Sequence, residues 1–361
     1  MSILFTPIAV GSLTVPNRFV RSATHDYMSD DEGHVRDAGV ALFARLAEGE
    51  VGLIVTGHAN VQPSGKASPR QMGVYDDRFV AGLARIPEAV HRFPSKVFLQ
   101  IAHAGRQTKE RDCGTVPVSP SAVYDPVSKV MPRELASEEV RTLIDDFVSA
   151  AGRAKRAGFD GVQLHAAHGY LLSSFLSPHT NRRTDEWGGP VENRARPLLE
   201  ILRGVKSACG RDFPVMVKLN STDFLPGGLT VDDAVRVAVM LEAGGIDAIE
   251  VSGGMAEAGR GSVWPGLRSE PEEGYFVENA ARIKRAVRIP VSGLGGIRTL
   301  AVAERAVRDG LVDLISLSRP LIRDPFLVKH FREGLAAKSA CSSCNKCFNP
   351  RGIRCAELRK R

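Results

Sequence analysis

The stretch that decides the fold spans residues 158–194 and reads GFDGVQLHAAHGYLLSSFLSPHTNRRTDEWGGPVENR. Its apolar run GVQL is too short for a helix and predicts a buried strand of a parallel sheet. His165, His168 and Tyr170 stand where this strand ends. Catalytic side chains in α/β folds gather at the carboxyl ends of parallel strands, because the sheet holds them rigidly while the loops vary. The three residues are therefore candidates for an active site.

Similar short apolar runs recur along the chain, with helical patterns between them. The predicted strands are 18–23, 51–56, 97–102, 161–165, 215–219, 248–251, 290–292 and 314–317. Helix-start signals at Ser137 and Thr230 open segments that end at Ala157 and Ala243. About eight strands alternating with helices predict a closed (β/α)8 barrel, whose strand ends meet at one face.

We expect one barrel domain over residues 1–335 and a short cysteine-rich tail over 336–361. A chain of 361 residues with 43% hydrophobic content can bury one large core. The segment 105–132 is rich in Pro, Ser and Gly and longer than a barrel connection needs. It is interpreted as a loop on the active face that shapes the pocket.

Composition narrows the class of protein further. No apolar stretch approaches the roughly 18 to 20 residues of a membrane span, and the N-terminus has no basic leader, so we expect a soluble, cytoplasmic protein. The net charge of +7 comes from Lys and Arg spread along the chain, with a cluster only at 359–361. This distribution does not favour nucleic acid and suits an anionic cofactor or substrate. Cys113 and Cys209 are isolated and are expected to be structural.

Polar groups at other predicted strand ends point to an anion site. The turn at 293–296 contains three glycines that let backbone amides approach a phosphate, although such a turn alone is often an ordinary tight turn. Arg319, at the next strand end, adds a charge-assisted donor. Lys218 could point outward as a solvated charge, but alternation with Val217 and Leu219 favours the barrel mouth, where it needs an anionic partner.

The histidines and the tyrosine admit more than one role. The spacing of His165 and His168 could suggest metal ligation, but no carboxylate lies between them and the segment is a strand end. They could also be hydrogen-bonded residues of a polar loop. We favour a pair of donors to a carbonyl oxygen on which negative charge develops. Tyr170 is protonated at neutral pH and could donate a proton, or it could be a packed aromatic.

The chain resembles the Old Yellow Enzyme family of flavin mononucleotide (FMN) oxidoreductases. The resemblance runs from Leu4 to about Phe331 through LFTPIAVGSLTVPNRFVRSAT, QIAHAGRQ, the stretch quoted above and DLISLSRPLIRDP. It implies noncovalent FMN at the barrel mouth, NAD(P)H as hydride source and reduction of the activated carbon–carbon double bond of an enone or enoate. We also expect a homo-oligomer.

The resemblance implies a role for each candidate position. His165 and His168 would bind the substrate carbonyl, and Tyr170 would protonate the α carbon. The positions that would contact FMN are Ser22, Ala23, Gly57 and Gln100 around its ring, Lys218 beside N1 and the C2 carbonyl, and Gly295, Ser318 and Arg319 at its phosphate. Three positions depart from common members of the family: His25 replaces Thr or Cys near the flavin C4 carbonyl, Lys218 replaces arginine, and Ser318 replaces glycine.

The tail adds four cysteines, Cys341, Cys344, Cys347 and Cys355. Their spacing suits structural zinc or a four-iron cluster. It resembles the cluster motif of multidomain relatives that reduce dienoyl-CoA or oxidise trimethylamine, although the spacings there are longer. In those relatives the cluster passes electrons between FMN and a further nucleotide-binding region, for which we expect no room here. A separate electron-donor protein, a structural site or free thiols are the alternatives.

Other functions remain open from the residues alone. An electron-transferring FMN and iron–sulfur subunit of a larger complex would explain the cysteine-rich tail. A dienoyl-CoA-type reductase would explain both the barrel and the tail. A tRNA dihydrouridine synthase-type barrel needs a catalytic cysteine in an active-face loop, for which Cys113 is the candidate. A flavin-free phosphate-binding barrel predicts a colourless protein.

Overall fold

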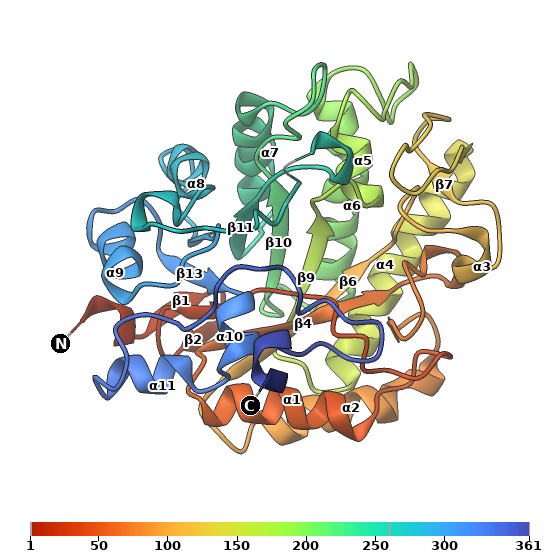
Figure 1. The fold of residues 1–361 in the computed structure, drawn as a ribbon. Coiled ribbons are helices and arrows are strands. Elements are labelled where there is room, and N and C mark those ends of the chain that lie inside the picture. Colours follow the sequence, from red (N-terminus) through yellow and green to blue (C-terminus); the bar gives the residue numbers. More distant parts are fainter. Residues whose placement is uncertain (1, 260, 361) are drawn as a thin grey trace.

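The computed structural model describes residues 2–259 and 261–360. Eight parallel strands close into a barrel with helices around it (Figure 1), which confirms the predicted (β/α)8 fold. Closure comes from β3, which pairs with both β13 and β4. The barrel strands are β3 (Phe19–Arg21), β4 (Leu53–Asn60), β6 (Lys96–Ala102), β9 (Gly161–Ala166), β10 (Val215–Asn220), β11 (Ala248–Ser252), β12 (Val291–Gly293) and β13 (Leu314–Leu317).

Amphipathic helices cover the outside of the barrel. In α4, buried apolar residues recur every three or four positions from Val140 to Ala154, and this face packs inward. The predicted helix starts are confirmed: α4 begins at Ser137, and the Thr230 hydroxyl accepts from the Asp233 N–H at the start of α7. The covering helices are α1 (Asp37–Glu48), α2 (Val80–Val90), α4 (Ser137–Arg156), α6 (Val191–Cys209), α7 (Val231–Ala243), α8 (Val277–Lys284) and α9 (Leu300–Arg308).

Short elements fill the connections. They are the strands β1 (Ile8–Val10), β2 (Leu13–Val15), β5 (Met72–Gly73), β7 (Val118–Ser119) and β8 (Arg133–Glu134), the helices α3 (Glu110–Cys113), α5 (Leu171–Leu176), α10 (Arg319–Arg323) and α11 (Leu327–Arg332), and the 3-10 turns η1 (Ile3–Phe5), η2 (Pro63–Gly65), η3 (Asp77–Phe79), η4 (Ala256–Ala258), η5 (Glu270–Glu272) and η6 (Ala356–Lys360). Within the described ranges, no helix combines the length and the apolar character needed to cross a membrane.

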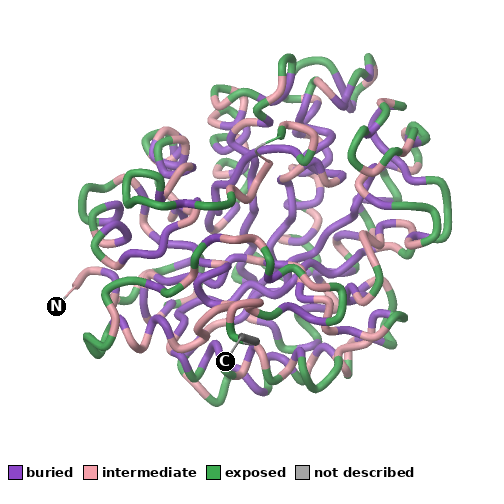
Figure 2. Tube along the Cα trace, in the orientation of Figure 1, coloured by how far each residue is buried: buried purple, intermediate pink, exposed green. Residues whose placement is uncertain are grey.

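The barrel interior changes character along its axis. An apolar cluster fills one end, where Val10 and Val15 of the β1–β2 hairpin pack against Leu53, Phe98 and Met216. These strand residues lie near the amino ends of their strands, and the barrel strands themselves are buried (Figure 2). Because side chains alternate along a strand, the next inward positions lie toward the carboxyl ends. The polar residues described below occupy those positions.

The tail crosses the loops at the carboxyl ends of the strands, as the dark blue trace in Figure 1 shows. Lys338 bridges to Thr299, and the Ser343 carbonyl accepts from Gly266 N–H at 2.9 Å. Further along, the Ile353 N–H donates to the Asp26 carbonyl at 2.7 Å. The tail is therefore joined by backbone hydrogen bonds to loops that follow β12, β11 and β3.

Candidate active site

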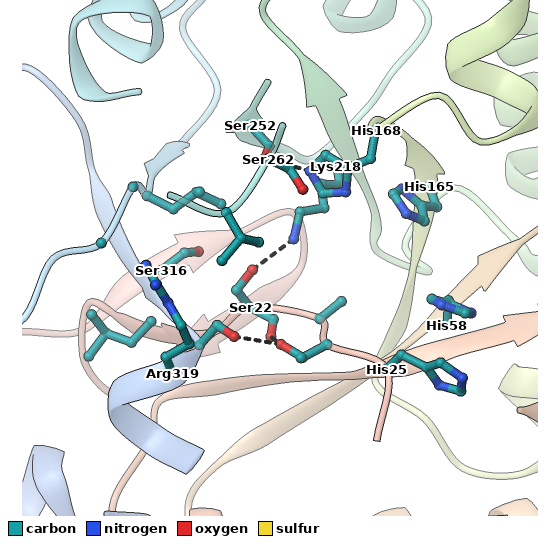
Figure 3. A pocket seen from close by; sticks show the side chains of 18 of the residues that line it. Ser22, His25, His58, His165, His168, Lys218, Ser252, Ser262, Ser316 and Arg319 are labelled. Atoms are coloured by element: carbon teal, nitrogen blue, oxygen red, sulfur yellow. Dashed lines mark hydrogen bonds between the residues drawn. The ribbon is translucent and has the colours of Figure 1, made fainter. Parts of the chain in front are cut away.

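A cavity of about 310 Å³ opens at the carboxyl ends of the barrel strands. Figure 3 shows Arg319 and Ser316 at one end, Lys218 and Ser22 between, and histidines at the other end. The structure brings together nearly all of the predicted residues; those that line the cavity are Ser22, Ala23, His25, Gln100, His165, His168, Tyr170, Lys218, Gly295, Ser318 and Arg319.

Gly57 is the exception, and His58 lines the cavity instead. The β4–β6 register pairs Val55 with Phe98 and His58 with Gln100, so β4 holds one extra residue between the two pairs. This β-bulge shifts the alternation by one position. Gly57 consequently faces the loop that carries Asp26, where an added Cβ would lie 2.9 Å from the Asp26 Oδ2.

Lys218 points into the barrel mouth, as alternation predicted, and it has protein partners there. Its Nζ donates to Ser22 Oγ at 2.8 Å (Figure 3) and lies 3.4 Å from Glu250 Oε2. Glu250 also accepts from Gln163 at 3.1 Å, and Gln163 in turn accepts from Gln100 at 2.7 Å. A buried polar layer therefore spans four strands beneath the cavity. The Glu250 carboxylate in this layer was not predicted from the sequence.

The Lys218–Glu250 pair sets the charge at the base of the cavity. Burial lowers the pKa of Lys218, and the opposite charge of Glu250 partly restores it. Burial raises the pKa of Glu250, but attraction to Lys218 and side-chain hydrogen bonds outweigh this and leave the pKa below its usual value. The two groups form a buried ion pair, and Lys218 lines the cavity.

Replacing Lys218 by methionine is expected to lower the free energy of unfolding by about 3–5 kcal/mol, because it leaves the fully buried Glu250 carboxylate without its counter-charge. Adding Glu250→Gln to Lys218→Met should restore most of that loss. Urea unfolding of the two variants at pH 7 measures the difference. A double variant as unstable as Lys218→Met would show that loss of packing, rather than an unpaired charge, is responsible.

The Arg319 end carries the predicted anion-binding groups. Gly295 and Gly296 have φ values of 126° and 73°, which side chains other than glycine rarely adopt. Ser318 Oγ lies 2.7 Å from Thr24 Oγ1. Arg319 Nη1 donates to the carbonyls of Trp264, at 2.9 Å, and Ser343, at 3.3 Å, and to Asn345 Oδ1 at 2.6 Å. The tail therefore helps to hold this guanidinium at the cavity wall.

The opposite end holds the predicted substrate residues. His165 Nδ1 is buried and has no hydrogen-bond partner among the described residues. His168 Nε2 lies 2.7 Å from Ser252 Oγ, and the ring centroids of His165 and Tyr170 are 4.7 Å apart. Burial lowers the pKa of both histidines well below the usual value, and Lys218 adds to the effect. Both rings are therefore neutral at pH 7, and each has one N–H to donate.

Loop segments close the rest of the cavity differently from the prediction. Among the described residues of 105–132, only Gln107 lines it. The wall comes from Ser262, Val263 and Tyr275, and the tail adds Phe348. Cys113 does not line this cavity, and its thiol donates to the Thr115 carbonyl at 3.0 Å.

The four tail cysteines line one small pocket, which Arg319 also lines. Arg323 Nη1 lies 3.4 Å from Cys355 Sγ, and burial raises the pKa of Cys341 and of Cys347. Four thiols around one pocket are a donor set that suits zinc or an iron–sulfur cluster. As placed here, however, no three His, Cys, Asp or Glu side chains in the described part of the chain are arranged to hold a metal ion.

The cavity as a whole fits an elongated anionic cofactor. Arg319 and the glycine turn suit a phosphate, Lys218 suits negative charge on a ring, and the unpartnered His165 nitrogen suits a ligand oxygen. These features define a barrel with a binding site for an anionic cofactor at the carboxyl ends of its strands.

Comparison with known proteins agrees with this class. Residues 3–338 match the NADH:flavin oxidoreductase / NADH oxidase family, and the chain belongs to that family. An NADH oxidase from Thermoanaerobacter brockii is 39% identical, covering 95% of this chain and 52% of the relative.

Two solved structures are also similar. A 2-naphthoyl-CoA reductase complex superposes with a TM-score of 0.90 at 32% identity, covering 96% of this chain and 54% of that chain. An old yellow enzyme homologue from Zymomonas mobilis gives a TM-score of 0.83 at 27% identity, covering 98% and 97%. The expected resemblance to Old Yellow Enzymes is thereby confirmed. The chain spans about half the length of the NADH oxidase and of the naphthoyl-CoA reductase, and nearly all of the Zymomonas protein.

Proposed function

We propose that this chain binds FMN and reduces the activated carbon–carbon double bond of an α,β-unsaturated carbonyl compound with hydride from NAD(P)H. Bound FMN would accept that hydride and deliver it to the substrate β carbon. The observation that carries the proposal is that a buried, unpartnered His165 nitrogen, a neutral His168 and the Tyr170 hydroxyl share one cavity with the Lys218 ammonium.

One set of cavity residues would bind the cofactor, and another would bind the substrate. Ser22, Ala23, Gln100 and Lys218 would contact the flavin ring, where the ammonium stabilises an anionic reduced ring. The phosphate would lie against Gly295, Ser318 and Arg319, with His25 near the ring edge.

At the substrate end, His165 and His168 would donate to the carbonyl oxygen. Each neutral ring keeps one N–H for this purpose, and negative charge grows on that oxygen as hydride arrives. Tyr170 would give its hydroxyl proton to the α carbon, since burial raises its pKa and keeps the oxygen protonated at neutral pH.

Purified protein should be yellow, and its flavin absorbance should bleach with NADH or NADPH in the absence of oxygen. Adding 2-cyclohexenone to the reduced protein should restore the absorbance. A parallel addition of an enoyl-CoA thioester tests the alternative substrate class, which the likeness to the naphthoyl-CoA reductase supports. Protein that stays colourless after incubation with FMN, or a flavin that neither nucleotide reduces, would remove the proposal.

We further propose that the cysteine pocket holds an iron–sulfur cluster, with zinc and free thiols as the alternatives. A cluster there would let a separate electron-donor protein supply electrons. Thiolates are the ligands of such sites, so binding would release protons from Cys341 and Cys347, whose pKa burial raises. Protein purified without oxygen should contain about four iron and four sulfide per chain. Zinc without sulfide would indicate a structural site. Absence of both iron and zinc would indicate that the four cysteines are free thiols.

A further inference from the structure

We infer that His58 is a positioning residue for Tyr170: its Nε2–H donates to the tyrosine oxygen, orients the hydroxyl proton toward the substrate, and stabilises the phenolate left when that proton is transferred. The inference rests on the proton-donor role proposed above for Tyr170.

His58 lies close to Tyr170 at the histidine end of the cavity. The bulge in β4 turns its side chain inward, where it is 6% exposed, and Figure 3 shows it beside His25 and facing His165. His58 Nε2 lies 3.4 Å from Tyr170 Oη, and the two ring centroids are 5.3 Å apart. Catalytic hydrogen bonds are often this long without substrate and shorten when substrate binds.

The direction of this hydrogen bond follows from Gln71, a buried neighbour. The Gln71 Oε1 accepts from the Ala67 N–H at 2.6 Å, which fixes the orientation of the amide. Its Nε2 therefore donates, at 2.6 Å to His58 Nδ1 and at 3.2 Å to the His58 carbonyl. Because Nδ1 accepts, the single proton of the neutral ring is on Nε2. His58 thus presents a donor, and not an acceptor, to Tyr170.

The charge state of the ring limits what it can do. Burial lowers the pKa of His58 to about 4, with a further contribution from Lys218, so the ring is neutral at pH 7. A neutral imidazole does not replace the proton that Tyr170 gives away. Its N–H stays on nitrogen and donates to the oxygen throughout.

That donor matters most during proton transfer. The Tyr170 O–H bond breaks, the proton forms a bond to the α carbon, and the electron pair stays on the phenolate oxygen. Burial raises the pKa of Tyr170, so the phenolate is costly in this cavity. A hydrogen bond to a charged oxygen is stronger than one to a neutral oxygen, so the His58 donor favours the products of the step over the reactants.

A matched pair of variants isolates the donor. His58→Gln places an amide N–H near the position of Nε2, whereas His58→Met has similar length and no donor. Anaerobic stopped-flow mixing of the NADH-reduced protein with 2-cyclohexenone measures reoxidation, and mixing of the oxidised protein with NADH measures reduction. We expect His58→Met to slow reoxidation about 10- to 100-fold, as loss of a hydrogen bond to a charged group would. His58→Gln should recover most of that rate, and reduction should change little in either variant.

The same measurement in a Tyr170→Phe background separates this inference from the proposed function. If His58 acts through the tyrosine oxygen, His58→Met should have no further effect once that oxygen is absent. Equal slowing by His58→Met with and without Tyr170, or equal slowing of reduction, would overturn the inference and leave Tyr170 as the donor. Tyr170→Phe protein that is reoxidised at the normal rate would remove the donor role itself, and the inference with it.

A measurement on the unaltered protein provides a second test if His58→Met does not fold. In the 15N spectrum of histidine-labelled protein, with His58→Gln used for assignment, His58 should show a protonated Nε2 and an unprotonated Nδ1 at pH 7. Protonation at Nδ1 would turn Nε2 into an acceptor and overturn the inference.

Discussion

Replacing Tyr170 by phenylalanine is expected to slow reoxidation of the reduced flavin by an enone about 10²- to 10⁴-fold, the range for loss of a positioned general acid. Phenylalanine keeps the ring that packs 4.7 Å from His165 and 5.3 Å from His58, and removes only the hydroxyl. Reduction of the flavin by NAD(P)H requires no proton at a substrate carbon. Its rate should therefore change little.

Anaerobic stopped-flow spectroscopy measures the two half-reactions separately, and variants of His165 and His168 are the controls. Because these histidines are assigned to the carbonyl, their loss should weaken binding of an enone or a phenol. Equal slowing of both half-reactions in Tyr170→Phe would indicate a distorted cavity. Unchanged ligand affinity in the histidine variants would remove their assignment to the carbonyl.

Acidification from pH 6.5 to 4.5 is expected to reduce the free energy of unfolding by roughly 5 kcal/mol through His58 and His103 alone. Burial lowers the pKa of His58 to about 4 and that of His103 to about 3, whereas both titrate near 6.5 in the unfolded chain. In this window the unfolded chain binds more protons than the folded chain. The free energy of unfolding therefore decreases by about 1.4 kcal/mol for each ring when the pH is lowered by one unit. Burial raises the pKa of Asp26 to about 6. The folded chain therefore takes up a proton at Asp26 as the pH falls, and this stabilisation offsets roughly the loss from one histidine.

His103→Asn tests this account away from the cavity. His103 Nδ1 accepts from the Gly105 N–H at 3.0 Å, and the asparagine oxygen can accept in its place. The variant should lose about 1.4 kcal/mol per pH unit from the slope of stability against pH between 4.5 and 6. Urea unfolding at several pH values, with FMN in constant excess, measures the slope. An unchanged slope would show that His103 is not a source of the acid sensitivity.

The fold was largely predictable because barrel strands carry their own pattern. All eight predicted runs are strands, since each is short, apolar and bounded by turns, and alternation around Val217 correctly directed Lys218 inward. The segment 105–132 was harder to predict. Its composition indicates an exposed loop but does not say whether that loop reaches the cavity. It forms α3 and β7, and only Gln107 of its described residues reaches the cavity.

The missed site residues depend on register, which one sequence does not contain. The Glu250 carboxylate stands in a predicted buried strand, but its partnership with Lys218 requires the β10–β11 pairing. The family resemblance assigned Gly57 to the flavin ring, but an extra residue in β4 exchanges inward and outward positions, so His58 lines the cavity. Phe348 of the tail also lines the cavity. The tail has no helical or strand pattern of apolar residues from which its path could be predicted.

Arg319 lines both the cavity and the cysteine pocket, so the two share one guanidinium. Ligands that move the same side chain have linked binding free energies, and the linkage is equal in both directions. A ligand of the cysteine pocket that shifted Arg319, which is hydrogen-bonded to Asn345 of the tail, would change the hold of the guanidinium on an anion in the cavity. The affinity of the cavity for an anion would thus depend on whether the pocket formed by the four tail cysteines is occupied.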